Sequence, residues 1–188
     1  VFLGVSGLVT MPATAGLIVL FARLRAGYPV RQYLGLRWVG AGPLLGWLGI
    51  ALLFAACSDG LSLILGRPIV PEVALEPYRT PGALPVLTAA VLVAAPVCEE
   101  LIFRGFLYDG LRSSRLGAAG AIVLSALVWA AFHTKYDLYG VATIFCMGIL
   151  LGLARHRTRS TVPAMWMHFM TNLVATVEAL WLLHGGAA

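Results

Sequence analysis

The sequence predicts an all-α, polytopic membrane helix bundle of about six transmembrane helices. The chain has 188 residues, of which 60% are hydrophobic and only 11% are charged, whereas soluble domains carry about 25% charged residues. Its mean hydropathy is +0.90. A small domain leaves much of its surface wet, so this much apolar side chain cannot all be hidden in a core. A lipid-facing exterior is therefore expected.

Six apolar stretches are long enough to cross about 30 Å of hydrocarbon at about 1.5 Å per residue. Only helices satisfy their own backbone hydrogen bonds in lipid at such lengths. We find no repeat and no linker that would separate domains, so residues 1–188 are expected to form a single integral membrane domain. The predicted spans are Phe2–Ala22, Ala41–Leu65, Leu84–Leu111, Ala118–His133, Leu138–Ala154 and Val162–Leu183.

The loops between these spans alternate in charge. Nine arginines follow the first, third and fifth spans, whereas the other two loops hold three basic residues. This asymmetry predicts that the arginine-rich loops are cytoplasmic and that both termini lie outside. The expected location is a bacterial cytoplasmic membrane. The basic residues do not form one patch, so no nucleic-acid partner is expected. The nine are Arg23, Arg25, Arg31, Arg37, Arg112, Arg115, Arg155, Arg157 and Arg159.

The third predicted span contains the stretch VCEELIFRGF, with three ionisable residues in an apolar run. Glu99, Glu100 and Arg104 would together cost about 8–10 kcal/mol if left unpaired near the middle of a membrane. Glu100 and Arg104 are four residues apart on one helical face, which favours a structural ion pair. Glu99 lies about 100° around the helix and is expected to face other helices. An unpaired carboxylate there would suit general-base chemistry.

Later spans supply further polar groups. His133 ends the fourth predicted span, and His168 and Asn172 share one face of the sixth at a spacing of four residues. The rise of a helix places these groups and Glu99 within reach of one layer of the bundle, with access expected from the side of the arginine-rich loops. Intramembrane ionisable groups usually face the bundle interior and mark functional sites.

These motifs resemble those of the CPBP family of intramembrane proteases, which includes the eukaryotic CAAX prenyl endopeptidase and bacterial Abi-type proteins. The first motif is Glu99 and Glu100 with Arg104; the resemblance extends over about residues 84–183. Trp129 with His133 matches the second motif, where the family usually has Phe in place of the tryptophan. His168 with Asn172 matches the third.

The resemblance implies hydrolysis of a peptide bond within or beside the membrane. By that similarity Glu99 and His133 would activate a water, and His168 and Asn172 would stabilise the oxyanion. Glu100, Arg104 and Trp129 would be structural. The family is also described as metal-dependent, and Glu99, His133 and His168 match the ligand set of some catalytic zinc sites. The sequence leaves open whether zinc or another divalent metal takes part.

The expected partners are the lipid bilayer and a membrane-anchored protein or peptide substrate. Prenylated CAAX tails are substrates of some family members, but the sequence does not identify the substrate here. Two other functions stay open. The chain could be a non-catalytic membrane partner or immunity protein of the same fold, or a proton-coupled transporter, since carboxylates and histidines in a bundle also carry protons.

Overall fold

A computed structural model describes residues 2–24, 27 and 29–185 of the chain, and in this part of the chain every regular element is helical. The prediction of an all-α membrane bundle is confirmed. Arg25 lies outside the described residues. The long helices are α1 (Phe2–Leu24), α3 (Ala41–Ile64), α8 (Gly117–Ala131), α9 (Leu138–Thr158) and α10 (Val162–His184), and the third span is a continuous series of shorter helical segments over Leu84–Arg112.

The predicted spans agree with these helices: five of the six begin at the predicted residue, and every end is within two residues of the prediction except that of α9, which ends at Thr158 and not at Ala154. One difference affects the site. Helix α8 ends at Ala131, so His133 lies in the loop after the helix and not in its last turn as predicted. The short helices α2 (Val30–Tyr33) and α4 (Glu72–Leu75) and the 3₁₀ segment η1 (Glu76–Arg79) were not predicted, because each is a single turn within a loop.

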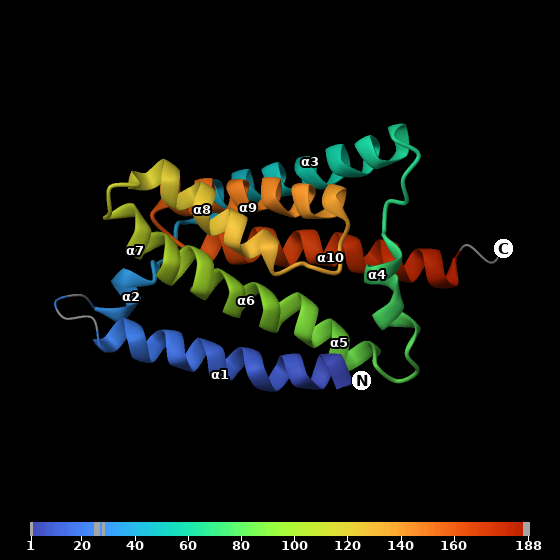
Figure 1. The fold of residues 1–188 in the computed structure, drawn as a ribbon, viewed down its shortest axis with the longest axis horizontal. Coiled ribbons are helices and arrows are strands. Elements are labelled where there is room, and N and C mark those ends of the chain that lie inside the picture. Colours follow the sequence, from blue (N-terminus) through green and yellow to red (C-terminus); the bar gives the residue numbers. More distant parts are fainter. Residues whose placement is uncertain (1, 25–26, 28, 186–188) are drawn as a thin grey trace.

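The helices lie roughly side by side, with α1 at one edge of the bundle and α3 at the other (Figure 1). Helix α8 packs against α9, and α10 packs against both α3 and α9. The loops that follow α1, α7 and α9 lie at one end of the bundle. The loops that follow α3 and α8 lie at the opposite end, together with the start of α1 and the end of α10. The arginine-rich loops therefore share one end, as the alternation predicted.

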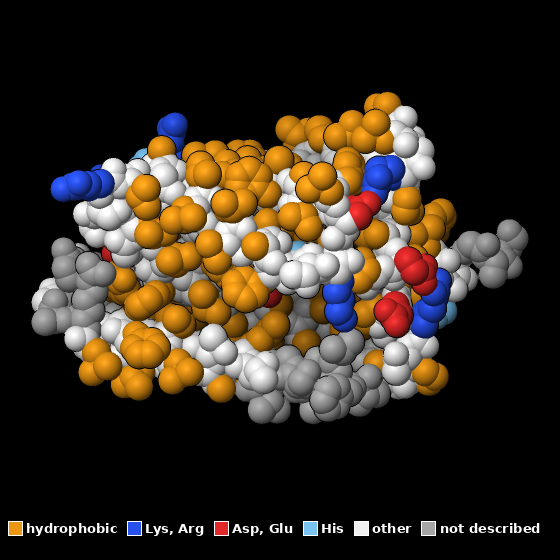
Figure 2. Space-filling model, viewed as in Figure 1, with side chains coloured by type: hydrophobic (Ala, Val, Ile, Leu, Met, Phe, Trp, Pro, Cys, Tyr) orange, Lys and Arg blue, Asp and Glu red, His pale blue; other side chains and the backbone are white. Residues whose placement is uncertain are grey.

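Much of the surface is apolar. Figure 2 shows hydrophobic side chains over the middle of the visible face and most charged side chains toward its two ends. Ile64 and Leu138 are 83% and 85% exposed, which is unfavourable in water but not in lipid. Among the described residues, three helical stretches are long and apolar enough to cross a membrane: Ala41–Ile64, Leu84–Arg112 and Leu138–Thr158. The total of six spans stays a prediction.

The third span is not a regular α-helix. It runs through α5 (Leu84–Ala89), η2 (Ala90–Ala94), α6 (Ala95–Glu100), η3 (Leu101–Leu107) and α7 (Tyr108–Arg112), and η2 and η3 are π-helical. The π-helical pattern replaces the usual i→i−4 bond with an i→i−5 bond, and such segments are frequent at functional sites. One segment precedes Glu99 and Glu100 and the other follows them directly.

Pro96 explains the irregularity at η2. Ala95 donates its backbone N–H to the carbonyl of Ala90, which is the i→i−5 pattern. The next bond in that pattern would run from residue 96 to the carbonyl of Val91, but proline has no N–H. The side-chain Nδ2 of Asn172 in α10 donates to that carbonyl instead, at 2.8 Å. A side chain from the sixth span thus satisfies the backbone group that Pro96 leaves without a donor.

Helices α8 and α9 approach each other closely through Gly148 and Gly152. A Cβ atom at position 148 would lie 2.9 Å from Cβ and 3.1 Å from Cα of Ala126. A Cβ at position 152 would lie 2.9 Å from a methyl carbon of Ile122. The two glycines therefore form a helix-packing face, and it brings α9 against the turn of α8 that ends in Trp129.

The predicted orientation can be tested by cysteine labelling. In a variant without the three native cysteines, we expect Arg157→Cys to be protected from a membrane-impermeant maleimide in intact spheroplasts. We expect Glu76→Cys to be labelled, because it is exposed at the opposite end of the bundle. Both should react after the membrane is permeabilised. The reverse pattern of protection would show that the arginine-rich end faces outward.

Candidate active site

The centre of the bundle holds a buried ion pair. Arg104 donates from NH1 to Oε1 of Glu100 at 2.9 Å, and both side chains are fully buried. The second terminal nitrogen of Arg104 donates to the carbonyl of Gly148 at 3.2 Å. The ion pair predicted from the four-residue spacing is therefore present. It ties the third span to α9, because the same guanidinium serves both the carboxylate and a backbone carbonyl of that helix.

Glu100 also contacts a histidine of the sixth span. His168 Nδ1 lies 3.0 Å from Oε1 of Glu100, and the imidazole is only 5% exposed. A carboxylate only accepts hydrogen bonds, so Nδ1 carries the proton and Nε2 is left for another partner. The role of Glu100 is thus wider than the structural ion pair alone, because one oxygen serves both Arg104 and His168.

Trp129 is the residue around which the other groups gather. Its indole Nε1 donates to Oε2 of Glu99 at 2.6 Å. Its ring lies edge-on to His133 and to His168, with ring centroids 5.2 Å and 5.3 Å apart. The guanidinium carbon of Arg104 lies 4.6 Å from the same ring, within cation–π range. The ring is 4% exposed, so these contacts fix it in one place.

His133 is oriented by the backbone. Its Nδ1 lies 3.0 Å from the carbonyl oxygen of Trp129, which can only accept a hydrogen bond. Nδ1 therefore carries the proton, and the lone pair of the neutral ring is on Nε2. Both histidines of the site thus have Nδ1 occupied by an acceptor and Nε2 free to contact a ligand or a water.

These histidines face an open cavity of about 250 Å³. It extends along α10 from His168 past Asn172 to Glu178, and loop residues Val70 and Tyr136 border it. Both loop residues belong to the end of the bundle opposite the arginine-rich loops. The depths of the polar groups predicted access from the arginine-rich side. The cavity instead lies toward the opposite end of the bundle.

Other cavity residues shape its chemistry. The carboxyl groups of Asp59 and Glu178 lie close enough to interact on its wall. Burial raises the pKa of the Tyr136 phenol in the α8–α9 loop, so this group stays protonated near neutral pH and can donate a hydrogen bond. The apolar lining includes Phe54, Ala55, Ile69, Val70, Ile144 and Met147.

Most, but not all, of the predicted catalytic residues line the cavity. Trp129, His133, His168 and Asn172 line the cavity. Glu99 is half-buried and reaches the group through the indole of Trp129, and it is not a lining residue of this cavity. Trp129 was predicted only as a structural residue. The indole N–H, absent from the phenylalanine usual at this position, was the signal for the bond to Glu99.

Glu99, His133 and His168 were expected as possible ligands of a divalent metal. Nδ1 of His133 contacts a backbone carbonyl and Nδ1 of His168 contacts a carboxylate, and metal-ligating histidines use such partners. However, the described residues gather no group of three His, Cys, Asp or Glu side chains placed to hold an ion. The set Glu99, His133 and His168 therefore does not fit a three-ligand metal site in this arrangement, and the chemistry below uses no metal.

Comparison with known proteins agrees with the motifs. Residues 81–174, half of the chain, match the family model described as type II CAAX prenyl endopeptidase Rce1-like. An uncharacterised 24.3 kDa protein of Escherichia coli is 28% identical over 148 residues, which cover 70% of this chain and 66% of that protein. No solved structure gives a significant match. The matched segment contains every predicted site residue, and the chain belongs to the Rce1-like family of type II CAAX prenyl endopeptidases.

Proposed function

We propose that the protein is an intramembrane endopeptidase that cleaves a membrane-associated protein with a water activated by Glu99 and His133. The observation that carries this proposal is the arrangement around Trp129. Two imidazoles with free Nε2 atoms line one cavity, and the indole that packs against both of them also holds the carboxylate of Glu99. Family membership supports the reaction class, since the family is one of endopeptidases.

The proposed reaction begins with a water near Nε2 of His133 and the second oxygen of Glu99. Oε1 of Glu99 has no hydrogen-bond partner in the described part of the chain, because Trp129 occupies only Oε2. The Glu99–His133 pair removes a proton from the water as the water oxygen forms a bond to the scissile carbonyl carbon. The carbonyl oxygen becomes an oxyanion. The carbon–nitrogen bond then breaks as the carbonyl re-forms, and the leaving amine takes the proton from the Glu99–His133 pair.

His168 and Asn172 are the proposed donors to the oxyanion. His168 gives Nδ1–H to Glu100, so donation from Nε2 requires the protonated imidazolium. Asn172 donates one amide N–H to the carbonyl of Val91, and its second amide N–H can donate to the oxyanion. A single donor of this kind contributes about 3–4 kcal/mol to transition-state stabilisation.

The substrate proposed for this site is an extended segment of a membrane-anchored protein. The cavity offers polar groups at the histidines and an apolar wall from α3 and α9, including Phe54 and Met147. A peptide next to a lipid-modified or membrane-embedded residue would meet both surfaces. The resemblance to CAAX proteases makes a prenylated C-terminal tail the first candidate to test.

Substitution of Glu99 tests the catalytic proposal. Membranes from cells that express the wild type or Glu99→Gln would be compared by mass spectrometry of protein termini. We expect wild-type cells to contain trimmed membrane proteins that are absent from the Glu99→Gln cells. His133→Ala should give the same loss, because the proposed base needs both groups. Glu76→Gln, an exposed loop carboxylate, is the matched control and should behave as the wild type. Identical termini in the wild type and Glu99→Gln would refute the proposal.

Trp129→Phe tests how Glu99 is positioned. An aromatic ring is kept beside the histidines, but the donor to Oε2 is lost. We expect the rate of cleavage of the identified substrate to fall by about tenfold or more, because a hydrogen bond to a charged group is lost. The substrate concentration for half-maximal rate should change little. Trp181→Phe, at an exposed position of α10, is the control. Full activity of Trp129→Phe would show that the indole N–H does not position the base.

A further inference from the structure

A second cavity lies at the arginine-rich end of the bundle, and neither His133 nor His168 lines it. It has a volume of about 680 Å³ and is formed by α2, α7, the end of α9 and the loops next to them. Five arginines line it, and Asp109 is the one acidic residue among its described lining residues. The five are Arg31, Arg37, Arg112, Arg155 and Arg159.

Most of this positive charge is not neutralised. Asp109 accepts from Arg112 at 2.7 Å and from Arg155 at 3.3 Å through the same oxygen, so one carboxylate serves two guanidinium groups. Arg31 and Arg37 donate to the backbone carbonyls of Leu36 and Thr158, which orients them without cancelling their charge. Arg159 has no partner among the described residues. The cavity therefore carries a clear excess of positive charge.

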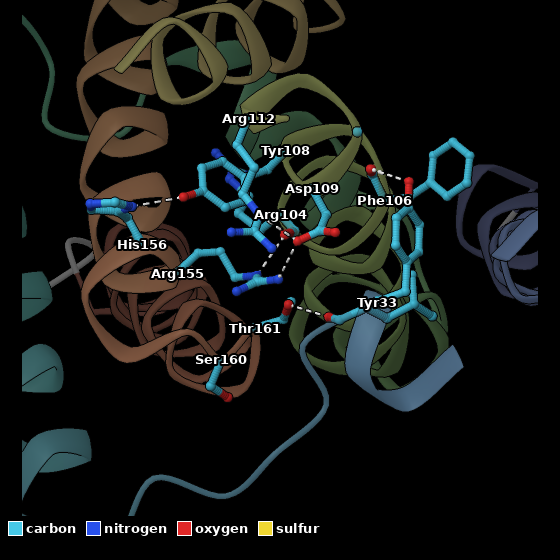
Figure 3. Close-up of polar contacts among 12 residues, drawn as sticks. Tyr33, Arg104, Phe106, Tyr108, Asp109, Arg112, Arg155, His156, Ser160 and Thr161 are labelled. Atoms are coloured by element: carbon cyan, nitrogen blue, oxygen red, sulfur yellow. Dashed lines mark hydrogen bonds and ion pairs between the residues drawn. The ribbon is translucent and has the colours of Figure 1, made fainter. Parts of the chain in front are cut away.

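Arg155 distinguishes this cavity from a set of solvated loop arginines. It is 4% exposed, and its Nε donates to the carbonyl of Arg104 at 3.0 Å (Figure 3). Gly35, with φ of +65°, lies against its guanidinium, and a Cβ there would be 2.7 Å from the guanidinium carbon. A buried cation is costly unless it is paired. Arg155 shares its single carboxylate with Arg112, so an anionic ligand would complete its pairing.

The walls of the cavity are fixed by hydrogen bonds between distant segments. Thr161 donates its backbone N–H to Gly35 at 2.9 Å and its hydroxyl to the carbonyl of Leu34 at 2.6 Å. The hydroxyl of Ser160 donates to the carbonyl of Arg37 at 2.5 Å. These bonds hold the loop after α2 against the start of α10. The arginines from α2 and α9 thus converge on a preformed space.

We propose that this cavity binds a phosphate group, supplied either by an anionic phospholipid headgroup or by free phosphate. The guanidinium group presents paired N–H donors that match phosphate oxygens, and several arginines around one space match a tetrahedral anion. Basic pockets between transmembrane helices bind the headgroups of anionic lipids. The Tyr108 hydroxyl, 2.9 Å from Nδ1 of His156, adds a polar edge to the same cavity.

The test uses the full chain in neutral detergent, with and without phosphatidylglycerol, phosphatidylcholine or inorganic phosphate. Native mass spectrometry would count bound lipid, and the melting temperature would report binding of each probe. The test variant is Arg31→Gln with Arg159→Gln, two exposed arginines of the cavity. The control variant is Arg115→Gln with Arg157→Gln, which removes the same charge from exposed residues at the same end but outside the cavity.

We expect phosphatidylglycerol to bind saturably and to raise the melting temperature, while phosphatidylcholine does neither. Binding should weaken by about tenfold in the test variant, because two cationic contacts are lost, and should be unchanged in the control. A response to inorganic phosphate alone, with the same dependence on Arg31 and Arg159, would identify free phosphate as the source. No response to either probe, or equal loss in both variants, would overturn the proposal.

Discussion

The structure depends on one constraint, which is that Glu100 and Arg104 are fully buried in a bundle with an apolar exterior. Neither charge can reach water, so each must be satisfied inside the protein. The four-residue spacing provides the first contact, and Gly148 and His168 provide the next ones. Three spans are thereby held in one arrangement. The close approach of α8 and α9 through glycine follows the same logic, because it brings the Gly148 carbonyl to the guanidinium.

Trp129 turns this structural core into a candidate catalytic site. Its ring covers the Arg104 guanidinium on one side and contacts both histidines at its edges. Its N–H holds the carboxylate of Glu99, which belongs to the same helix as the ion pair but points in another direction. One rigid, buried side chain therefore positions the proposed base relative to the imidazoles. Active-site groups need such support to keep their geometry.

The sequence allowed the fold to be predicted well for a physical reason. Lipid requires long uninterrupted apolar helices, so the ends of the spans are marked by abrupt changes in composition. The Glu100–Arg104 pair was also predictable, because helical geometry fixes which residues are neighbours within one helix. The π-helical segments were not predicted. Pro96 was the available sign, since it removes the N–H whose place the Asn172 amide takes.

Contacts between spans were harder to predict than contacts within them. The bond from Trp129 to Glu99 and that from His168 to Glu100 depend on how the helices are rotated about their axes, and residue spacing within one helix does not determine that. The cavity at the arginine-rich end has the same origin. Its arginines come from three separate parts of the chain, in or next to the loops at that end, and were interpreted only as topology signals. Hydrogen bonds from Ser160 and Thr161 join the loop after α2 to the one before α10.

The most direct test of the buried pair is a double-mutant cycle on Glu100 and Arg104. The free energy of unfolding in detergent would be measured for Glu100→Met, Arg104→Met and the double variant. Each single change should destabilise the protein by about 3–5 kcal/mol, because it leaves an uncompensated buried charge. The double variant should lose far less than the sum. Additive losses in the double variant would contradict the claim that this pair organises the site.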